Sequence, residues 1–525
     1  MSEPYPDTVS PAPEGRACAF VPQPRRVTAA DAPAWRPGAS TRVLVQERHH
    51  DRLAPTARVL AEDLARQGYT PGLPEVAPYA GESEAGPEDL VLRLDTVSGA
   101  PGGEQEAYHL TLAAPAVLTA HTERGVHQAG RTLLQSLRPA QPRVAWEVTD
   151  WPAYPVRGLT VDAGRRAFSV RWLEGLIREL SALKLNELHL HLSDSLAFRV
   201  ESGTHPEIVS PQALTKAELR GLAGLAARHH IALVPEFDTP GHLRSVLEAH
   251  PELRLRLADG TVRGENLDYS LPEARALVRD LLHEYAELMP GDLFHLGGDA
   301  YFGNFWEPEH RITPELAPQL ARYAREHAGT EEATLHDGYA AYLNELAGVL
   351  RAHGKRARVW NDEIVPSGAV RLHQDVQVDT WIRWSHAQPS AADYLRAGYD
   401  VVNGHGDHLY YVHAGEAPHM AGPGSRGKKS APGIYEDWTP RTVMDAPGED
   451  AELLADEPGV QGGGTLLGAH MSVWCDAPGP ATEDEIAQDT APWKRAFAER
   501  MWCPSDSARD HEAFERRYAV LDAAR

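Results

Sequence analysis

Eight short apolar runs, each followed by a longer amphipathic stretch of helical period, occupy the chain from Arg157 to Trp474. The runs are GLTVDA, ELHLHLS, IALVPEFD, LFHLGGD, ARVWND, VQVDTWI, DVVNGH and GTLLGAHMSVW. Apolar runs of this length that alternate with helical stretches are typical of strands in a parallel sheet. Eight such units predict an α/β protein with a (β/α)₈ barrel, also called a TIM barrel, in which chemistry collects at the C-terminal strand ends.

The rest of the 525 residues predicts a second, smaller domain before the barrel. Residues 1–40 are rich in Pro and Ala, so we expect a loosely ordered N-terminal segment there. Over residues 41–142, apolar runs alternate with helical stretches at Pro55–Gln67 and Arg124–Leu137, which indicates a small α+β domain. The barrel is expected over 150–525, with a long insertion at about 410–463 that helps to wall the pocket.

The formal net charge is -24, and the acidic residues are spread along the chain. This distribution argues against nucleic acid or an anionic membrane surface as the partner and favours a neutral or cationic small substrate. Three cysteines, Cys18, Cys475 and Cys503, have spacings that match neither a zinc site nor a disulfide framework. With no leader pattern and no long apolar run, we expect a soluble, cytoplasmic protein; its oligomeric state stays open.

Polar and aromatic side chains lie at or just past the ends of the predicted strands, namely Asp162, Arg165, Asp194, Asp238, His242, Asp299, Trp360, Asp362, Trp381, Trp474 and Asp476. Tryptophan faces pack on the apolar faces of sugar rings, while carboxylates and arginine bind hydroxyls. A single buried tryptophan is usually part of a core, but several at successive strand ends favour a carbohydrate site.

His189 and His191 suggest an alternative, because an H-x-H on a strand places both imidazoles on one face. With His242, His295 and Asp299 nearby, the pair could belong to a metal-dependent hydrolase of the amidohydrolase kind. Histidines in barrel layers commonly serve as hydrogen-bonded packing, and we favour that interpretation.

Four segments, RGLTVDAGRRAF, LKLNELHLHLSDSLAFRVES, IALVPEFDTPGH and FHLGGDA, follow one another in an order and spacing that resemble glycoside hydrolase family 20, the β-N-acetylhexosaminidases. The resemblance covers about Trp151–Asp476, and EAYHLTLAAPAVLTAHTERGVHQAGRTLLQSL is similar to the family's small N-terminal domain. It implies exo-acting, retaining hydrolysis of terminal β-linked GlcNAc or GalNAc, in which the substrate's own acetamido oxygen attacks and forms an oxazolinium intermediate. It implies no cofactor and no metal ion.

By this resemblance, Asp299 in HLGGD is the carboxylate that binds the acetamido N–H. The next position in the family is the acid/base glutamate, and here it is Ala300, so we expect binding with very little turnover. Because the other pocket residues are retained, we favour a substitution introduced to trap a ligand. A natural amino-sugar-binding protein that never turned over is the alternative.

The resemblance also supplies a supporting relay and a sugar-binding set. The relay is expected from Asp194, Asp238 and His242. The sugar-binding set is Arg165 for the 3- and 4-hydroxyls, Tyr410 for the acetamido oxygen, Asp476 for the outer hydroxyls, and Trp360, Trp381 and Trp474 as walls, with Trp438 as a fourth wall. SDSLAF lacks the acid and tryptophan of many members, and Val412 replaces a frequent Asp or Asn, so the choice between GlcNAc and GalNAc stays open.

Overall fold

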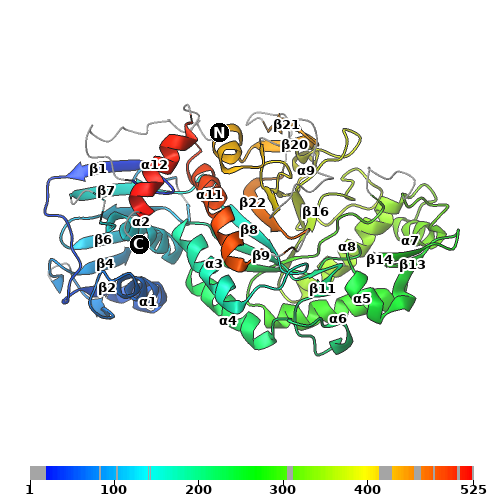
Figure 1. Cartoon of the computed structure of the whole chain (residues 1–525), viewed down its shortest axis with the longest axis horizontal. Helices are drawn as coiled ribbons and strands as arrows, with labels where there is room; N and C mark the ends of the chain where they lie inside the picture. Colours follow the sequence, from blue (N-terminus) through cyan, green and yellow to red (C-terminus); the bar gives the residue numbers. More distant parts are fainter. Residues whose placement is uncertain are drawn as a thin grey trace.

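The computed structural model describes residues 19–81, 84–101, 104–139, 141, 144–303, 311–412, 428–453, 463–476, 479, 481–504 and 509–522. Within them, a seven-stranded mixed sheet with its helices lies beside a barrel (Figure 1). Cys18, most of the expected N-terminal segment's first half and residues 413–427 and 454–462 of the expected insertion lie outside the described residues. Cys475 is a buried free thiol.

The small domain is built on a sheet whose strands run in the order β1 (Arg26–Ala30), β7 (Ala145–Asp150), β5 (Tyr108–Thr111), β6 (Ala116–Ala120), β4 (Leu90–Leu94), β2 (Arg42–Gln46) and β3 (Glu75–Tyr79). The short helix η1 (Glu47–His49) leads into α1 (His50–Arg66), and α1 packs beside α2 (Glu123–Ser136) against the sheet. The apolar stripes of these two helices and the inward residues of the strands form one core. The predicted small α+β domain is therefore confirmed.

The expected limits of this domain, 41 and 142, are too narrow. β1 pairs antiparallel with β7, so residues on both sides of those limits belong to the same sheet. Upstream of β1, Ala19, Phe20 and Val21 are buried, and the Ala19 N–H donates to Gln141 Oε1 at 3.0 Å. The sequence RVTAA in β1 has no apolar alternation because this edge strand is largely exposed, which is why its pattern indicated no strand.

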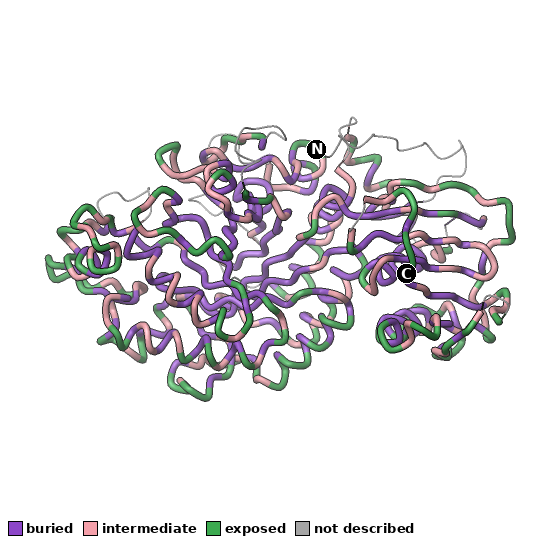
Figure 2. Tube along the Cα trace, turned by 180° about the vertical axis from the view of Figure 1, so that it is seen from behind, coloured by how far each residue is buried: buried purple, intermediate pink, exposed green. Residues whose placement is uncertain are grey.

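Eight parallel strands close into the barrel: β8 (Val156–Asp162), β9 (Glu187–His191), β12 (Ala232–Glu236), β15 (Leu293–His295), β16 (Arg356–Trp360), β17 (Gln377–Thr380), β18 (Val401–Asn403) and β22 (Leu466–Trp474). The barrel closes because β22 pairs with both β18 and β8. Each predicted run corresponds to one of these strands, so the (β/α)₈ prediction is confirmed. The barrel strands form a continuously buried centre (Figure 2).

The larger helices of this domain are α3 (Val170–Ala182), α4 (Lys216–Arg228), α6 (Pro272–Leu288), α7 (Pro318–Ala328), α8 (Leu335–Ala352), α11 (Glu483–Trp502) and α12 (His511–Asp522), and the short helix α9 (Ala391–Arg396) precedes β18. α4 and α11 begin with capping boxes, in which a threonine and a glutamate three residues later satisfy each other's backbone N–H groups. Among the described helices, none has both the length and the apolarity needed to cross a membrane.

Short elements fill the loops at the C-terminal side of the strands. They are β10 (Ser193–Asp194), β11 (Ala197–Phe198), η3 (Pro206–Ile208), α5 (Arg244–Ala249), η4 (Pro251–Leu253), β13 (Arg254–Arg256), β14 (Val262–Leu267), β19 (Tyr410–Val412), η7 (Gly433–Asp437), β20 (Thr442–Ala446) and β21 (Glu449–Glu452). β19 adds to the C-terminal half of β22, which brings Tyr410 of the expected insertion to the barrel mouth.

Candidate active site

A cavity of about 320 Å³ opens among residues at the C-terminal ends of the barrel strands. Its lining consists of Arg165, His191, Asp194, His242, Asp299, Ala300, Trp360, Trp381, Trp384, Tyr410, Trp474 and Asp476. Most of the residues predicted from the sequence therefore come together around one space, although Arg165 and Asp476 lie more than three hundred positions apart in the chain. His191, which was expected from the sequence only as a metal ligand or as packing, also lines it, and so does Trp384, which was not singled out from the sequence.

Asp299 reaches the cavity because the chain turns sharply after β15. Gly297 and Gly298 have φ values of 72° and 96°, which residues with a side chain rarely adopt. A Cβ at Gly297 would lie 1.9 Å from Asp238 Oδ1, so this position also leaves no room for a side chain. One carboxylate oxygen of Asp299, Oδ2, lies 3.5 Å from His242 Nε2. The other, Oδ1, is buried without a hydrogen-bond partner among the described residues.

Ala300 continues this turn with a φ of 48° and is exposed at the cavity. The left-handed conformation costs an L-residue roughly 1–2 kcal/mol, so the surrounding loop holds it there. The side chain is a methyl group, which has no proton to exchange. The position beside Asp299 therefore contributes shape to the cavity and no acid or base.

Asp194 connects three cationic or polar neighbours at the cavity floor. Its Oδ2 lies 2.9 Å from Arg165 Nη2, 2.9 Å from His191 Nε2 and 3.6 Å from His242 Nδ1. Burial disfavours the carboxylate, but the charges of His242 and Arg165 and the hydrogen bond from His191 outweigh it and hold the pKa of Asp194 well below its ordinary value. Asp194 is therefore ionised at neutral pH.

His242 lies between two carboxylates, with Nδ1 facing Asp194 and Nε2 facing Asp299. Burial lowers the affinity of the imidazole for a proton, but Asp299 and Asp194 together raise its pKa to about 10. The ring is thus an imidazolium at neutral pH, and it neutralises much of the negative charge around the cavity.

Arg165 is held on three sides. Its guanidinium lies 2.9 Å from Asp162 Oδ2, 2.9 Å from Asp194 Oδ2 and 3.4 Å from Asp476 Oδ1, and it lies over the Trp474 ring at 5.6 Å. Only 18% of the side chain is exposed. An arginine fixed in this way presents its remaining donors to the cavity in a defined direction, which suits recognition of hydroxyl groups.

Aromatic rings form another part of the cavity lining, next to these charged groups. Tyr410 stacks between Trp381 and Trp474 with ring centroids 5.9 and 5.8 Å away, and Trp360 lies 6.0 Å from Trp474. The Tyr410 hydroxyl donates to Asp476 Oδ2 at 3.0 Å. A continuous aromatic surface beside a charged floor matches the two faces of a sugar ring.

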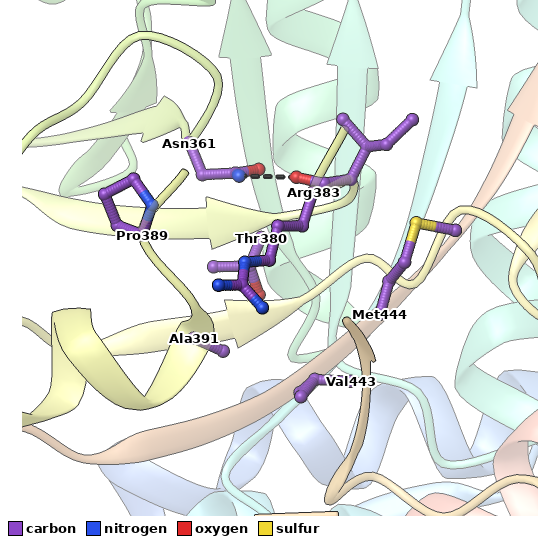
Figure 3. Close-up of a pocket in the computed structure, with 8 residues that line it drawn as sticks. Asn361, Thr380, Arg383, Pro389, Ala391, Val443 and Met444 are labelled. Carbon is purple, nitrogen blue, oxygen red and sulfur yellow. Dashed lines mark hydrogen bonds between the residues drawn. The ribbon is translucent and has the colours of Figure 1, made fainter. Parts of the chain in front are cut away.

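Trp384 is the fourth tryptophan of the cavity lining, and hydrogen bonds from Asn361 hold the segment that carries it. Asn361 Nδ2 donates to the Ile382 carbonyl at 2.6 Å, and the Trp381 N–H donates to Asn361 Oδ1 at 3.1 Å. A second, smaller cavity lies around these hydrogen bonds, between Asn361, Arg383 and Met444 (Figure 3). The W-I-R-W spacing is the sequence signal that could have identified Trp384, since both tryptophans donate to Asp362.

Trp438 does not form the expected fourth wall, and this prediction is corrected. It is fully buried, stacks on Phe497 of α11 at 5.8 Å and donates to the Thr442 carbonyl at 3.1 Å. The preceding turn η7 packs against α11, which directs the ring into the core. Its place in the insertion suggested a wall, but only packing could show which way the ring faces.

Asp238 lies behind the cavity, as expected, and does not line it. It accepts a hydrogen bond from the Gly298 N–H at 3.1 Å and so supports the turn that carries Asp299. Burial, followed by the charge of Asp299, raises the pKa of Asp238 well above its ordinary value. The two neighbouring carboxyl groups therefore share less negative charge than two carboxylates would.

His189 and His191 both turn toward the barrel interior and share Glu236 as a partner. His191 Nδ1 lies 2.5 Å and His189 Nε2 lies 3.0 Å from Glu236 Oε2, and the indole N–H of Trp360 donates to Oε1 at 2.7 Å. Burial lowers the pKa of His189 to about 4, so this ring is neutral. These contacts favour the packing interpretation of the H-x-H pair. They also identify Glu236, which sequence reasoning missed, as support for two cavity residues, His191 and Trp360.

Comparison with known proteins gives the same family for both domains. The model of the glycosyl hydrolase family 20 catalytic domain matches residues 154–505, and that of family 20 domain 2 matches residues 17–151. The second range agrees with the extent of the small-domain sheet, including β1 and β7.

Curated relatives include the lacto-N-biosidase of Bifidobacterium bifidum, which is 25% identical over 480 residues. That match covers 90% of this chain and 39% of the biosidase, so the chain spans well under half of that protein. The β-N-acetylhexosaminidase of Cellulomonas fimi is 27% identical over 533 residues, which cover 95% of this chain and 93% of that protein.

Solved structures share the fold along almost the whole chain. The β-N-acetylhexosaminidase from Bacteroides fragilis NCTC 9343 superposes with a TM-score of 0.73 at 21% identity, covering 96% of this chain and 95% of that one. The family 20 β-N-acetylhexosaminidase from Streptomyces coelicolor A3(2) has a TM-score of 0.68 at 22% identity, covering 96% and 94%.

Proposed function

Because the chain belongs to glycosyl hydrolase family 20, we propose that its cavity binds a terminal, β-linked N-acetylhexosamine and is built for substrate-assisted hydrolysis, with Ala300 in place of the acid/base. The observation that carries the proposal is the environment of Asp299. One oxygen faces the His242 imidazolium, and the other has no donor among the described residues. The amide N–H of an acetamido group is a donor of the required kind.

The chemistry follows from that contact. When Asp299 accepts the acetamido N–H, it stabilises the positive charge that develops as the acetamido oxygen attacks the anomeric carbon. The new C–O bond closes an oxazolinium ring while the bond to the leaving oxygen breaks. Water then opens the ring, and the anomeric configuration is retained after two displacements.

Two proton transfers in this sequence have no donor or acceptor in the chain at the expected place. The leaving oxygen needs a proton in the first step, and the attacking water must lose one in the second. Ala300 can do neither, so we expect hydrolysis about 10²- to 10⁴-fold slower than with an acid/base in this position. Binding needs no proton transfer and is expected to persist.

The test is to place a glutamate in the turn. In Ala300→Glu, we expect hydrolysis of 4-nitrophenyl N-acetyl-β-glucosaminide to rise by about 10²- to 10⁴-fold. The control is Ala300→Gln, which has the same shape and cannot exchange a proton, and it should show no gain.

A second experiment adds azide to the original chain with the same substrate. Azide is already an anion, so it can attack the oxazolinium intermediate without a base, and we expect the β-glycosyl azide as the product.

If Ala300→Glu folds, binds N-acetylglucosamine and still shows no gain over Ala300→Gln, the hydrolytic proposal is wrong. Equal rates of Ala300→Glu on the 4-nitrophenyl β-glucoside and on the N-acetylglucosaminide would contradict the participation of the acetamido group. The relative rates on GlcNAc and GalNAc substrates would settle the sugar preference.

A second candidate function is an amino-sugar-binding protein without turnover. The observation that favours it is that Ala300 lies in a cavity whose other lining residues suit sugar binding. It predicts saturable binding of N-acetylglucosamine and no gain of hydrolysis in Ala300→Glu.

The expected cytoplasmic location stays a prediction, which fractionation of the source cells would test.

A further inference from the structure

Outside the cavity, two histidines and three carboxylates gather where two loops of the barrel meet. His205 precedes η3, which contains Glu207, and His250 lies between α5 and η4, which contains Glu252. Asp280 of α6 completes the group. The two imidazole rings are perpendicular, with centroids 6.1 Å apart.

The two histidines point at a single atom. His205 Nδ1 lies 3.0 Å and His250 Nε2 lies 2.9 Å from the same oxygen, Oε1 of Glu207. Two ring nitrogens that converge on one point next to a carboxylate are the ligand arrangement that Zn²⁺ and similar transition-metal ions prefer.

The second nitrogen of each ring also faces a carboxylate. His205 Nε2 lies 3.5 Å from Asp280 Oδ2, and His250 Nδ1 lies 3.4 Å from Glu252 Oε1. Metal-binding histidines almost always direct their other ring N–H to a carboxylate, carbonyl or water, which fixes the tautomer and the ring orientation. His250 has such a hydrogen-bonded partner in Glu252, while the His205 ring nitrogen has a carboxylate within 3.5 Å and no hydrogen bond among the described residues.

The charge of the group also favours a cation. No lysine or arginine of the described chain pairs with Glu207, Glu252 or Asp280, so three negative charges face two imidazoles. Glu207 is 43% exposed, which leaves a path from solvent.

Another histidine pair, His405 and His408 with Asp450, does not have this uncompensated negative charge. There the Lys428 ammonium lies 2.7 Å from Asp450, and His405 Nδ1 accepts the Asp407 N–H at 3.2 Å. Because Nδ1 accepts an N–H, the neutral His405 ring carries its proton on Nε2, the nitrogen that faces Asp450, while Lys428 already neutralises that carboxylate. Both imidazole rings are also fully buried.

We propose that His205 Nδ1, His250 Nε2 and the Glu207 carboxylate bind a divalent transition-metal ion of the Zn²⁺ type. In a tetrahedral site with metal–ligand distances of about 2.0–2.1 Å, neighbouring ligand atoms lie about 3.3 Å apart. The nitrogens are already 2.9 and 3.0 Å from the carboxylate oxygen, so Glu207 needs to withdraw by only a few tenths of an ångström. Water takes the fourth position.

The proposed ion lies between the two loops that carry Asp194 and His242. His205 follows β11, which pairs with β10 and so with Asp194, while His250 ends the short helix α5 that begins just after His242. α5 packs against both β11 and η3. A bound ion would therefore join the two loops that carry Asp194 and His242 and would restrict their motion.

The experiment is a titration of the full chain, freed of metal by a chelator, with ZnCl₂ in a calorimeter. We expect one saturable site, which weakens at least about 30-fold in His205→Ala, His250→Ala and Glu207→Gln, since each removes a ligand. Hydrogen exchange of the original chain should show zinc-dependent protection in residues 198–210 and 244–254.

His283→Ala is the matched control, because His283 Nδ1 lies 2.8 Å from His353 Nε2 in another exposed pair that has no carboxylate partner among the described residues. It should leave zinc affinity unchanged, and all variants should keep the far-ultraviolet circular dichroism of the original chain. No saturable zinc binding, or equal affinity in His250→Ala and His283→Ala, would overturn the proposal. Neither outcome bears on the sugar cavity, which is tested separately through Ala300.

Discussion

At the scale of single residues, the cavity is organised by alternating charges. Asp299, His242, Asp194 and Arg165 follow one another as anion, cation, anion and cation, each within 3.6 Å of the next. Such a row neutralises itself without a metal ion and leaves the outermost carboxylate, Asp299, free on one side for a ligand. The effect of removing any member therefore depends on which neighbour loses its partner.

Asp299→Ala should weaken the binding of N-acetylglucosamine about 10- to 100-fold, because a hydrogen bond to a charged group contributes about 1.5–3 kcal/mol. Glucose has no N–H to donate, so its weaker binding should stay unchanged in the same variant. Calorimetric titration with both sugars measures the two effects. An equal loss for glucose would show that Asp299 acts on the cavity as a whole and has no specific partner in the acetamido group.

The charge of His242 predicts a pH dependence of stability. Its pKa is raised from 6.5 to about 10, so its stabilising contribution is complete below about pH 6.5 and is lost as the pH rises through about 10. Between about pH 7 and about pH 11, the free energy of unfolding should fall more steeply in the original chain than in His242→Gln. Urea unfolding at a series of pH values measures this difference, and parallel curves for the two proteins would contradict it.

At the scale of secondary-structure elements, several barrel strands end in a residue that lines the cavity, namely His191 of β9, Trp360 of β16 and Trp474 of β22, and neighbouring strands support these residues. β12 gives the clearest support, because its last residue, Glu236, contacts residues of two other strands: His189 and His191 of β9 and Trp360 of β16. Burial opposes the Glu236 carboxylate, but the charge of His191 and the hydrogen bond with His189 hold the pKa of Glu236 well below its ordinary value.

Glu236→Gln should lower the free energy of unfolding by about 3–5 kcal/mol, because it leaves buried partners without their counter-charge. Glu248→Gln, on the exposed face of α5, is the matched control and should change it by less than about 0.5 kcal/mol. Urea denaturation measures both. A loss at Glu236 as small as that of the control would mean that the polar layer of the barrel does not depend on this carboxylate.

At the scale of the whole molecule, buried polar contacts join the small domain to the barrel. Asp150 of β7 accepts from Lys184 at 2.9 Å, from Tyr108 at 2.7 Å and from Trp502 of α11. Beside it, Arg157 of β8 binds both oxygens of Glu106 at 2.9 and 2.7 Å. The small sheet and the barrel lie side by side (Figure 1), and these buried polar contacts connect them.

Asp150→Asn should destabilise the protein by about 3–5 kcal/mol, because the fully buried Lys184 ammonium loses its counter-ion. Asp31→Asn, an exposed site of the same domain, should have almost no effect. Scanning calorimetry measures the loss and shows whether one transition persists. If Asp150→Asn changes stability by less than about 1 kcal/mol, the interface does not depend on this ion pair.

The sequence by itself determined the barrel, the small domain and most of the cavity lining. These features depend on local signals, namely apolar runs of strand length, helical periods between them, and chemical residues directly after each run, as in HLGGDA. Because parallel strands of a barrel end at one face, residues such as Asp299 and Trp474 could be placed together without knowing any contact.

Only the tertiary structure decided which side chains turn toward the cavity and what charge they carry. Trp384 faces it and Trp438 does not, since the direction of each ring depends on packing against Asp362 or Phe497 far along the chain. The pairing of β1 with β7, the imidazolium state of His242 and the meeting of His205 with His250 likewise arise between distant segments. These features arise because folding buries residues and brings distant segments close together, and no local pattern in the sequence shows which segments will meet.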